Sequence, residues 1–188
     1  MTADRVSRLR VLPAEVATRE HTAVLAGGWD WPIAGCDTLD SYVDLALTSS
    51  RRRFVWVLQG DEPVGFLGVV RNDSERRFET STYLAPERRG TGLNRVLKHS
   101  LAAAFQTLGL PLVAVVRARN HRSLAAMRRL CSYPGSPAIA PDGTARLVFD
   151  LSGLDAHAAD PRIRSSFIDF APELRAMASR RACALLPA

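Results

Sequence analysis

Cysteine is scarce in this sequence and lysine is almost missing. The three cysteines are an odd number without Cys-x-x-Cys spacing, which argues against a disulfide framework or a zinc site and favours a reducing cytoplasm. Lysine occurs once, as Lys98, so nearly all of the 25 basic residues are arginines, and against 19 acidic residues they leave a net charge of +6. Because the arginines spread from Arg5 to Arg181, they mark no single basic patch for a nucleic acid.

Long apolar runs are also missing. The longest purely apolar stretch, Leu110 to Val116, is far too short to cross a bilayer, so we expect no membrane partner. The first five residues include Asp4 and Arg5 and form no apolar segment, so we expect no secretory signal. A length of 188 residues with 47% hydrophobic and 23% charged residues excludes a disordered or collagenous chain and predicts one globular domain over 1–188.

Hydrophobic periodicity divides the chain into strands and helices. Alternating or wholly apolar runs predict strands at 5–12, 54–58, 64–70, 78–84, 112–116 and 145–151. Patterns of period 3.6 predict helices at 14–25, 39–47 (capped by Asp37 or Thr38), 93–108 (stopped by Gly109), from Asn120 onward, and 161–187. Strands first, then strands and helices in alternation, predict an α/β (α+β) fold with a mixed sheet.

The segment from Tyr83 to Asn94 carries the clearest chemical signal. A strand runs into a turn with Gly90 and Gly92 and then directly into a helix. Unpaired amides at a helix N-terminus, with the partial positive charge there, form an anion site that suits a diphosphate. A bend that merely needs glycines explains the same pattern. The glycine spacing fits neither a P-loop nor a dinucleotide fingerprint.

Arg89-Gly90-Thr91-Gly92-Leu93-Asn94 resembles the acyl-CoA signature Arg/Gln-x-x-Gly-x-Gly/Ala of the GNAT N-acetyltransferases, with Asn94 in place of the last residue. Asn94 followed by Lys98, and Asn120-His121-Arg122-Ser123 further on, are similar to the branch of ribosomal-protein N-terminal acetyltransferases. The resemblance extends to the first strand, to a closing hairpin over 143–151 and to the start of the C-terminal helix. It implies a sheet of six to seven strands flanked by helices, in which a splayed parallel pair, ending at Leu84 and Val116, holds acyl-CoA.

The resemblance also implies where the co-substrate, acetyl-CoA or another acyl-CoA, would bind without a metal. Its diphosphate would lie on the amides from Arg89 through Gly90, Thr91, Gly92 and Leu93 to Asn94, and Lys98 would contact the phosphates or be a solvated lysine. The N–H near Leu84 would hold the thioester carbonyl. Asn120 and Ser123 would line the pantetheine and thiol end, although a helix cap with a polar first turn explains both residues as well.

Catalysis is less determined. Glu79 is the leading general base, with a solvated strand charge as the alternative; strand alternation gives it the same side as Ser81 and Tyr83 unless a bulge intervenes. Many members of the family place a proton-donating tyrosine where this chain has Met127, so Ser123 would contact the sulfur while water supplies the proton.

The amine acceptor has no motif of its own. Trp29, Trp31 and Tyr83 are candidate acceptor-binding rings, and core rings are an equal alternative. The predicted function is transfer of an acetyl group from acetyl-CoA to a primary amine, on a protein N-terminus or a small molecule, by a cytoplasmic monomer or homodimer. A catalytically weak acyl-CoA sensor is the alternative, and nucleic-acid binding driven by the +6 charge is the least favoured class.

Overall fold

A single mixed sheet forms the centre of the computed structural model, which describes residues 9–29 and 35–179. Its spatial order is β1-β2-β3-β4-β5-β7-β6, which confirms the predicted α/β class and strand number. All neighbouring strands pair antiparallel except β4 and β5, which run parallel. The strands are β1 (Leu9–Pro13), β2 (Arg52–Gln59), β3 (Glu62–Asn72), β4 (Arg77–Leu84), β5 (Leu112–Arg117), β6 (Ser136–Ile139) and β7 (Ala145–Asp150).

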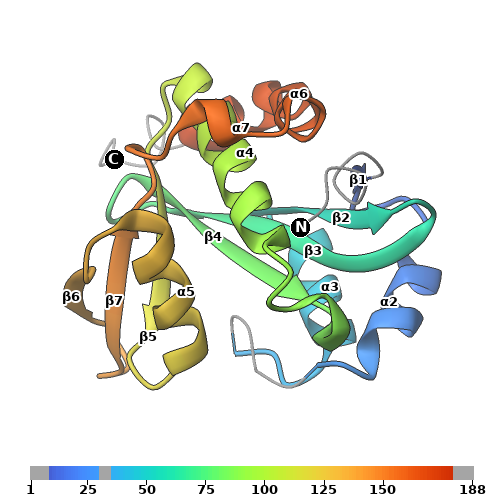
Figure 1. Cartoon of the computed structure of the whole chain (residues 1–188), viewed down its shortest axis with the longest axis horizontal. Helices are drawn as coiled ribbons and strands as arrows, with labels where there is room; N and C mark the ends of the chain where they lie inside the picture. The colour runs from blue at the N-terminus through green and yellow to red at the C-terminus, as the bar shows by residue number, and fades with distance from the viewer. Residues whose placement is uncertain (1–8, 30–34, 180–188) are drawn as a thin grey trace, which may run out of the picture.

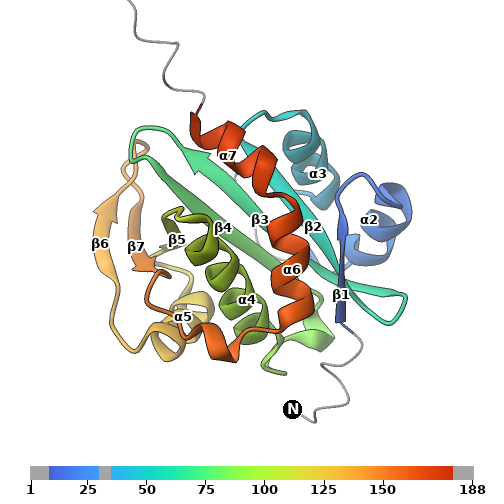
Figure 2. The same ribbon diagram turned by 90° about the horizontal axis from the view of Figure 1, so that it is seen from above.

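Helices cover both faces of this sheet (Figure 1). On one face lie α2 (Thr18–Ala26) and α3 (Leu39–Thr48), and the cap of α3 is Thr38, whose side chain accepts from the Ser41 amide. On the other lie α4 (Leu93–Leu108), α5 (His121–Cys131), α6 (Pro161–Asp169) and α7 (Ala171–Ser179), and Figure 2 shows α6 and α7 running beside α4 across the sheet. Short 3-10 turns, η1 (Pro86–Arg88) and η2 (Ala156–Ala158), precede α4 and α6.

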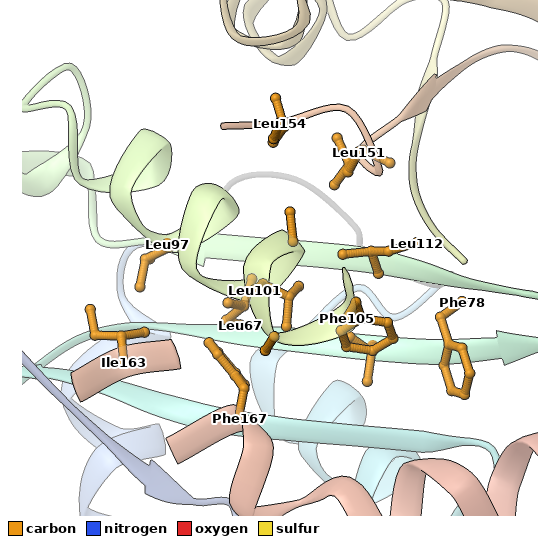
Figure 3. Close-up of a cluster of buried hydrophobic side chains, with 14 of the residues drawn as sticks. Leu67, Phe78, Leu97, Leu101, Phe105, Leu112, Leu151, Leu154, Ile163 and Phe167 are labelled. Atoms are coloured by element: carbon orange, nitrogen blue, oxygen red, sulfur yellow. The ribbon is translucent and has the colours of Figure 1, made fainter. Parts of the chain in front are cut away.

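Each face has its own hydrophobic core. The α2–α3 face is aromatic and contains Tyr42, Trp56 and Phe66. The opposite core is mostly aliphatic and centres on α4, where Leu101 and Phe105 lie beside Leu67 and Phe167 (Figure 3). Because alternate residues of β2, β3 and β4 supply the two cores, β2 and β3 are buried on both sides along most of their length, whereas β4 keeps half-buried polar residues.

A fork in the sheet is the feature that matters for function. The parallel pairing of β4 with β5 covers only Phe78–Thr80 against Leu112–Ala114, yet β4 continues to Leu84 and β5 to Arg117. Beyond Thr80 the two strands therefore leave each other, as Figure 1 shows. This divergence is the splayed pair that the family resemblance implied.

Three expectations from the sequence are wrong in detail. The predicted helix over 14–25 begins only at Thr18, because 14–17 form turns. The tail predicted as one helix over 161–187 is broken after α6 at Phe170, because Pro172 lacks an N–H and its ring clashes with the carbonyl four residues earlier. Residues 180–187 of that prediction lie outside the described residues. The Pro/Gly-rich segment after α5 contains an unpredicted strand, β6, whose edge position tolerates Pro137.

Candidate active site

A cavity of about 1080 Å³ occupies the fork. Its walls are the diverging ends of β4 and β5, the first turns of α4, and the inner side of α5. All the predicted site residues between Glu79 and Ser123, Tyr83 included, line this cavity, except Thr91. Trp29 does not line it. The topology therefore brings together residues that are up to 44 positions apart in the sequence.

The turn between β4 and α4 presents a row of main-chain donors. Gly90 and Gly92 have φ angles of 75° and 84°, a left-handed conformation that favours glycine. The amides from Gly90 to Asn94 donate no hydrogen bond to any described residue, whereas the Arg95 and Val96 amides bond to the Gly92 carbonyl. The Arg89 amide donates to the Pro86 carbonyl at 3.2 Å. The cradle, a row of free amides, therefore begins at Gly90, and the predicted contact of Arg89, which still lines the cavity, with the co-substrate stays a prediction.

The two arginines before the cradle shape the turn. Arg89 Nε donates to the Leu84 carbonyl at 2.8 Å, and its guanidinium lies 5.7 Å from the centre of the Tyr83 ring. Arg88 bonds to Gln59 at 2.8 Å and to Glu62 at 2.5 Å. Both guanidinium groups still line the cavity, so they contribute positive potential while they hold the turn in place.

The edge of β4 that faces the fork is open. The Ala85 amide donates to Val64 of β3, and the groups of a strand alternate between its edges, so the Thr82 and Leu84 amides face the cavity. Two buried side-chain oxygens on this side, Thr82 Oγ1 and Asn94 Oδ1, also have no hydrogen-bond partner among the described residues. Buried polar groups are normally satisfied, so a ligand with its own donors and acceptors fits here.

Lys98 lies deep in the fork and is not a solvated lysine. Its side chain is on α4, the residue is only 3% exposed, and Nζ donates to Thr80 Oγ1 at 2.9 Å. Burial without a carboxylate partner lowers the pKa of Lys98 from 10.5 to about 7, and Cys131 opposes this shift. Its predicted contact with phosphates stays a prediction, because the ammonium lies where the parallel pairing of the strands ends.

Asn120 and Ser123 start α5 at the cavity wall. Asn120 Oδ1 accepts from the Ser123 amide at 3.0 Å, so the capping alternative for Asn120 holds, and both residues line the cavity as well. Met127 is buried on the same helix. Tyr133, past the end of α5, is not among the cavity-lining residues, and its hydroxyl accepts a hydrogen bond from the Asp150 amide.

Glu79 lies on the face of β4 opposite that of Thr80, the residue that contacts Lys98. The pairing of β3 with β4 runs without interruption from Gly65–Leu84 to Asn72–Arg77, so no bulge reverses the predicted alternation. Glu79 Oε1 accepts from Asn72 at 2.7 Å and lies 3.6 Å from the Arg77 guanidinium. Glu79 is thus ion-paired as well as cavity-lining, and its role as a base stays a prediction.

One site-adjacent contact was not expected from the sequence. Tyr42 of α3 is 2% exposed, and its hydroxyl lies 3.1 Å from Ser81 Oγ, a cavity-lining atom next to Glu79. Burial raises the pKa of this tyrosine. Its helix was predicted, but a sequence pattern does not register a helix against a strand 39 positions later.

Two of the three candidate acceptor rings, Trp29 and Tyr83, belong to the aromatic core. Trp29 stacks near Phe66 at 6.2 Å and Tyr83 at 5.3 Å between ring centres. The Tyr83 hydroxyl donates to the Leu25 carbonyl, although Tyr83 also lines the cavity. The structure therefore favours the core alternative for Trp29, and Trp31 lies outside the described residues.

Residues 9–29 and 35–179 offer neither a metal site nor a membrane-spanning helix. No cluster of three or more His, Cys, Asp or Glu side chains there has the arrangement to hold a metal ion. No helix in the same part of the chain combines the length and apolar character needed to span a bilayer. Cys36 and Cys131 are free thiols.

Comparisons with known proteins agree with this geometry. A family model described as an acetyltransferase (GNAT) domain matches residues 10–130. A GNAT-family acetyltransferase of Bordetella pertussis has a similar fold, with a TM-score of 0.59 and 20% identity over 77% of this chain and 95% of that one. A mutant form of the spermidine/spermine N-acetyltransferase SpeG of Vibrio cholerae also has a similar fold, with a TM-score of 0.55 and 17% identity over 78% of this chain and 95% of that one. No curated protein matches.

Proposed function

Since the chain belongs to the family of GNAT acetyltransferase domains, we propose that it moves an acetyl group from acetyl-CoA to a primary amine by direct attack. The observation that carries the proposal is the row of free amides from Gly90 to Asn94 at the mouth of the fork. A diphosphate supplies the acceptors that these donors lack. The branch similar to ribosomal-protein N-terminal acetyltransferases stays a prediction, because no comparison distinguishes it.

The remaining polar groups of the fork fit the pantetheine arm. The open edge at Thr82 and Leu84 offers amides to an amide-bearing chain, as a neighbouring strand would. The unpaired oxygens of Thr82 and Asn94, with Ser123 across the cavity, supply further partners. We propose that an edge amide near Leu84, either that of Leu84 itself or that of Thr82 deeper in the fork, holds the thioester carbonyl and stabilises the oxyanion that forms on it.

The chemistry requires a neutral amine and a protonated leaving group. A protein α-amine has a pKa of about 8 and needs little help, whereas an alkyl amine near 10 needs a base, for which we propose Glu79 through water. The departing thiolate would be contacted by Ser123 and take its final proton from water.

The charge of the cavity bears on the acceptor. Among the described residues, nine basic side chains line it against two acidic ones, Glu79 and Asp142. Part of this excess serves the anionic co-substrate, and the rest disfavours a polycation such as spermidine. We therefore propose an acceptor with one amine and little further positive charge, either a protein N-terminus or a small-molecule amine.

An acyl-CoA sensor is the second candidate, supported by Met127 in place of a tyrosine. Release of free thiol from acetyl-CoA, measured with a panel of peptides, small amines and polyamines, separates the two. Turnover with a peptide or a small amine, and weaker turnover with spermidine, is the expected result. Saturable binding of CoA without turnover on any acceptor would establish the sensor instead.

Location and partners complete the proposal. The scarcity of cysteine and the two free thiols support the cytoplasm as the compartment, with a monomer or homodimer as the working form. We propose no nucleic-acid partner. A titration on duplex DNA should show no specific binding at physiological salt, and tight, steeply salt-dependent binding would contradict this.

A further inference from the structure

Lys98 is a primary amine inside the cavity that we assign to an acyl donor, and its nitrogen takes no part in the proposed bond-forming step. It is the chain's single lysine. Its nitrogen is one hydrogen bond from Thr80, the last residue of β4 that pairs with β5. Gly92 of the cradle caps the helix that carries Lys98, and the two residues are six positions or roughly 9 Å apart along its axis. The open edge of β4 leads from Leu84 to Thr80 over roughly 13 Å.

The hydrogen bonds around Lys98 leave its lone pair available. The Thr80 hydroxyl donates its proton to the Gly68 carbonyl at 3.1 Å, so this oxygen can only accept from Lys98. Lys98 forms no ion pair with a carboxylate of the described residues. Among the ionisable groups, the Cys131 thiol of α5 is the one whose charge acts on the pKa of Lys98. A neutral Lys98 thus keeps an uncommitted lone pair in the fork.

We propose that Lys98 is a self-acetylation site, at which the protein accepts the acetyl group of its own acetyl-CoA when no amine acceptor is present. The inference rests on the proposed function, because it needs the thioester in this fork. Nζ of the neutral amine attacks the thioester carbonyl, so a C–N bond forms and the C–S bond breaks. The electron pair leaves on sulfur, which takes the proton that nitrogen loses. The products are free CoA and acetylated Lys98.

The ionisation of Lys98 supports this reactivity. With a pKa of about 7, close to half of the amine is neutral at pH 7. An exposed lysine with a pKa near 10.4 is neutral in roughly one molecule in 2,500 at that pH. Acetylation at Lys98 should therefore proceed at least about a hundredfold faster than at an exposed lysine, and its rate should level off above about pH 8.

The acetylated side chain has a consequence for the enzyme. An acetamide at the end of the fork takes the space that the reactive end of the acyl donor needs. We therefore expect transferase activity to fall as the modified fraction rises during incubation with acetyl-CoA alone. An amine acceptor added from the start should protect the enzyme, because it competes for the acetyl group.

Mass spectrometry of the full-length protein tests the proposal. The protein is incubated with acetyl-CoA without acceptor and then digested, so that Lys98 is distinguished from the N-terminal amine. A second protein with Arg175→Lys carries an exposed reference lysine on α7, away from the cavity. We expect saturable acetylation at Lys98, suppression by excess CoA, little at the reference lysine, and none in Lys98→Arg.

A parallel titration of the protein with CoA distinguishes failure of this inference from failure of the proposed function. If the protein binds CoA and acetylates an external amine while Lys98 stays unmodified, this inference is wrong and the proposed function stands. If Lys98 and the reference lysine are modified at equal rates, the reaction is solution chemistry and the inference is wrong as well. If CoA does not bind at all, both proposals fail.

Discussion

The buried side chain of Lys98 costs the folded protein free energy whenever its amine is charged. Lys98 is surrounded by the core of α4 and has one neutral hydrogen-bond acceptor. Such a site disfavours the ammonium, so the folded protein must release a proton or carry an uncompensated charge. A methionine of similar length would fill the same space without this cost, so the amine at this position lowers stability where it must stay charged.

Replacing Lys98 with Met should change how stability depends on pH. The pKa is about 7 in the folded protein and 10.5 in the unfolded chain, so the unfolded chain binds more protons between these values. The free energy of unfolding therefore rises with pH in this window, by roughly 2 kcal/mol between about pH 7 and pH 9. Lys98→Met should be more stable at pH 7 and lose this rise. Urea unfolding of both proteins at several pH values measures the difference, and parallel pH curves would refute the shifted ionisation.

Glu79 makes a second prediction at the residue scale. Glu79→Gln should lower kcat/KM for an alkyl amine by about a hundredfold, and most at lower pH, because the acceptor then needs a base. Glu75→Gln is the matched control, since Glu75 pairs with the same Arg77 guanidinium but is not among the residues that line the cavity. An unchanged pH–rate profile in Glu79→Gln would exclude Glu79 as the base.

At the scale of elements, the unit of β4, its turn and α4 builds most of the site. The sequence predicted this unit well, because its information is local: glycines at both ends of α4, a stripe of apolar residues, and strand alternation that gave Glu79 and Thr80 opposite sides. Pairings between distant segments were not predictable in this way. Neither the contact of Lys98 with Thr80 nor that of Tyr42 with Ser81 has a signal in spacing.

The two glycines at the ends of α4 allow a controlled test of the cradle. Gly92 and Gly109 both have left-handed backbones, with φ of 84° and 66°. Gly92→Ala and Gly109→Ala should each lower stability by roughly 1 kcal/mol, because alanine is strained in this conformation. Only Gly92→Ala should weaken CoA binding, by at least about tenfold in calorimetric titration. Equal affinities in the two variants would move the diphosphate away from this turn.

At the scale of the whole molecule, the C-terminal helices complete the core that carries the site. Ile163 and Phe167 of α6 lie against α4 (Figure 3), so the tail buries the helix that presents both the cradle and Lys98. The sequence predicted the tail's helical character but not the break at Phe170. The fork came only with the resemblance to a family and the order of the strands only with the structure, because composition and periodicity carry no information on which strands pair.

Truncation of one tail side chain measures this support. Phe167→Ala should reduce the free energy of unfolding by about 3–5 kcal/mol, since it opens a cavity against α4. Ser165→Ala, on the exposed side of α6, should change it by less than about 0.5 kcal/mol. If the two variants are equally stable in denaturant titrations, α6 does not hold α4 in place.

A crystal structure of the protein with CoA is the measurement that decides most. The account predicts diphosphate oxygens within hydrogen-bond distance of the amides from Gly90 to Asn94, with the arm along the open edge of β4 and the sulfur near Thr80. A diphosphate bound elsewhere, or side chains closing the fork while these amides stay free, would contradict it.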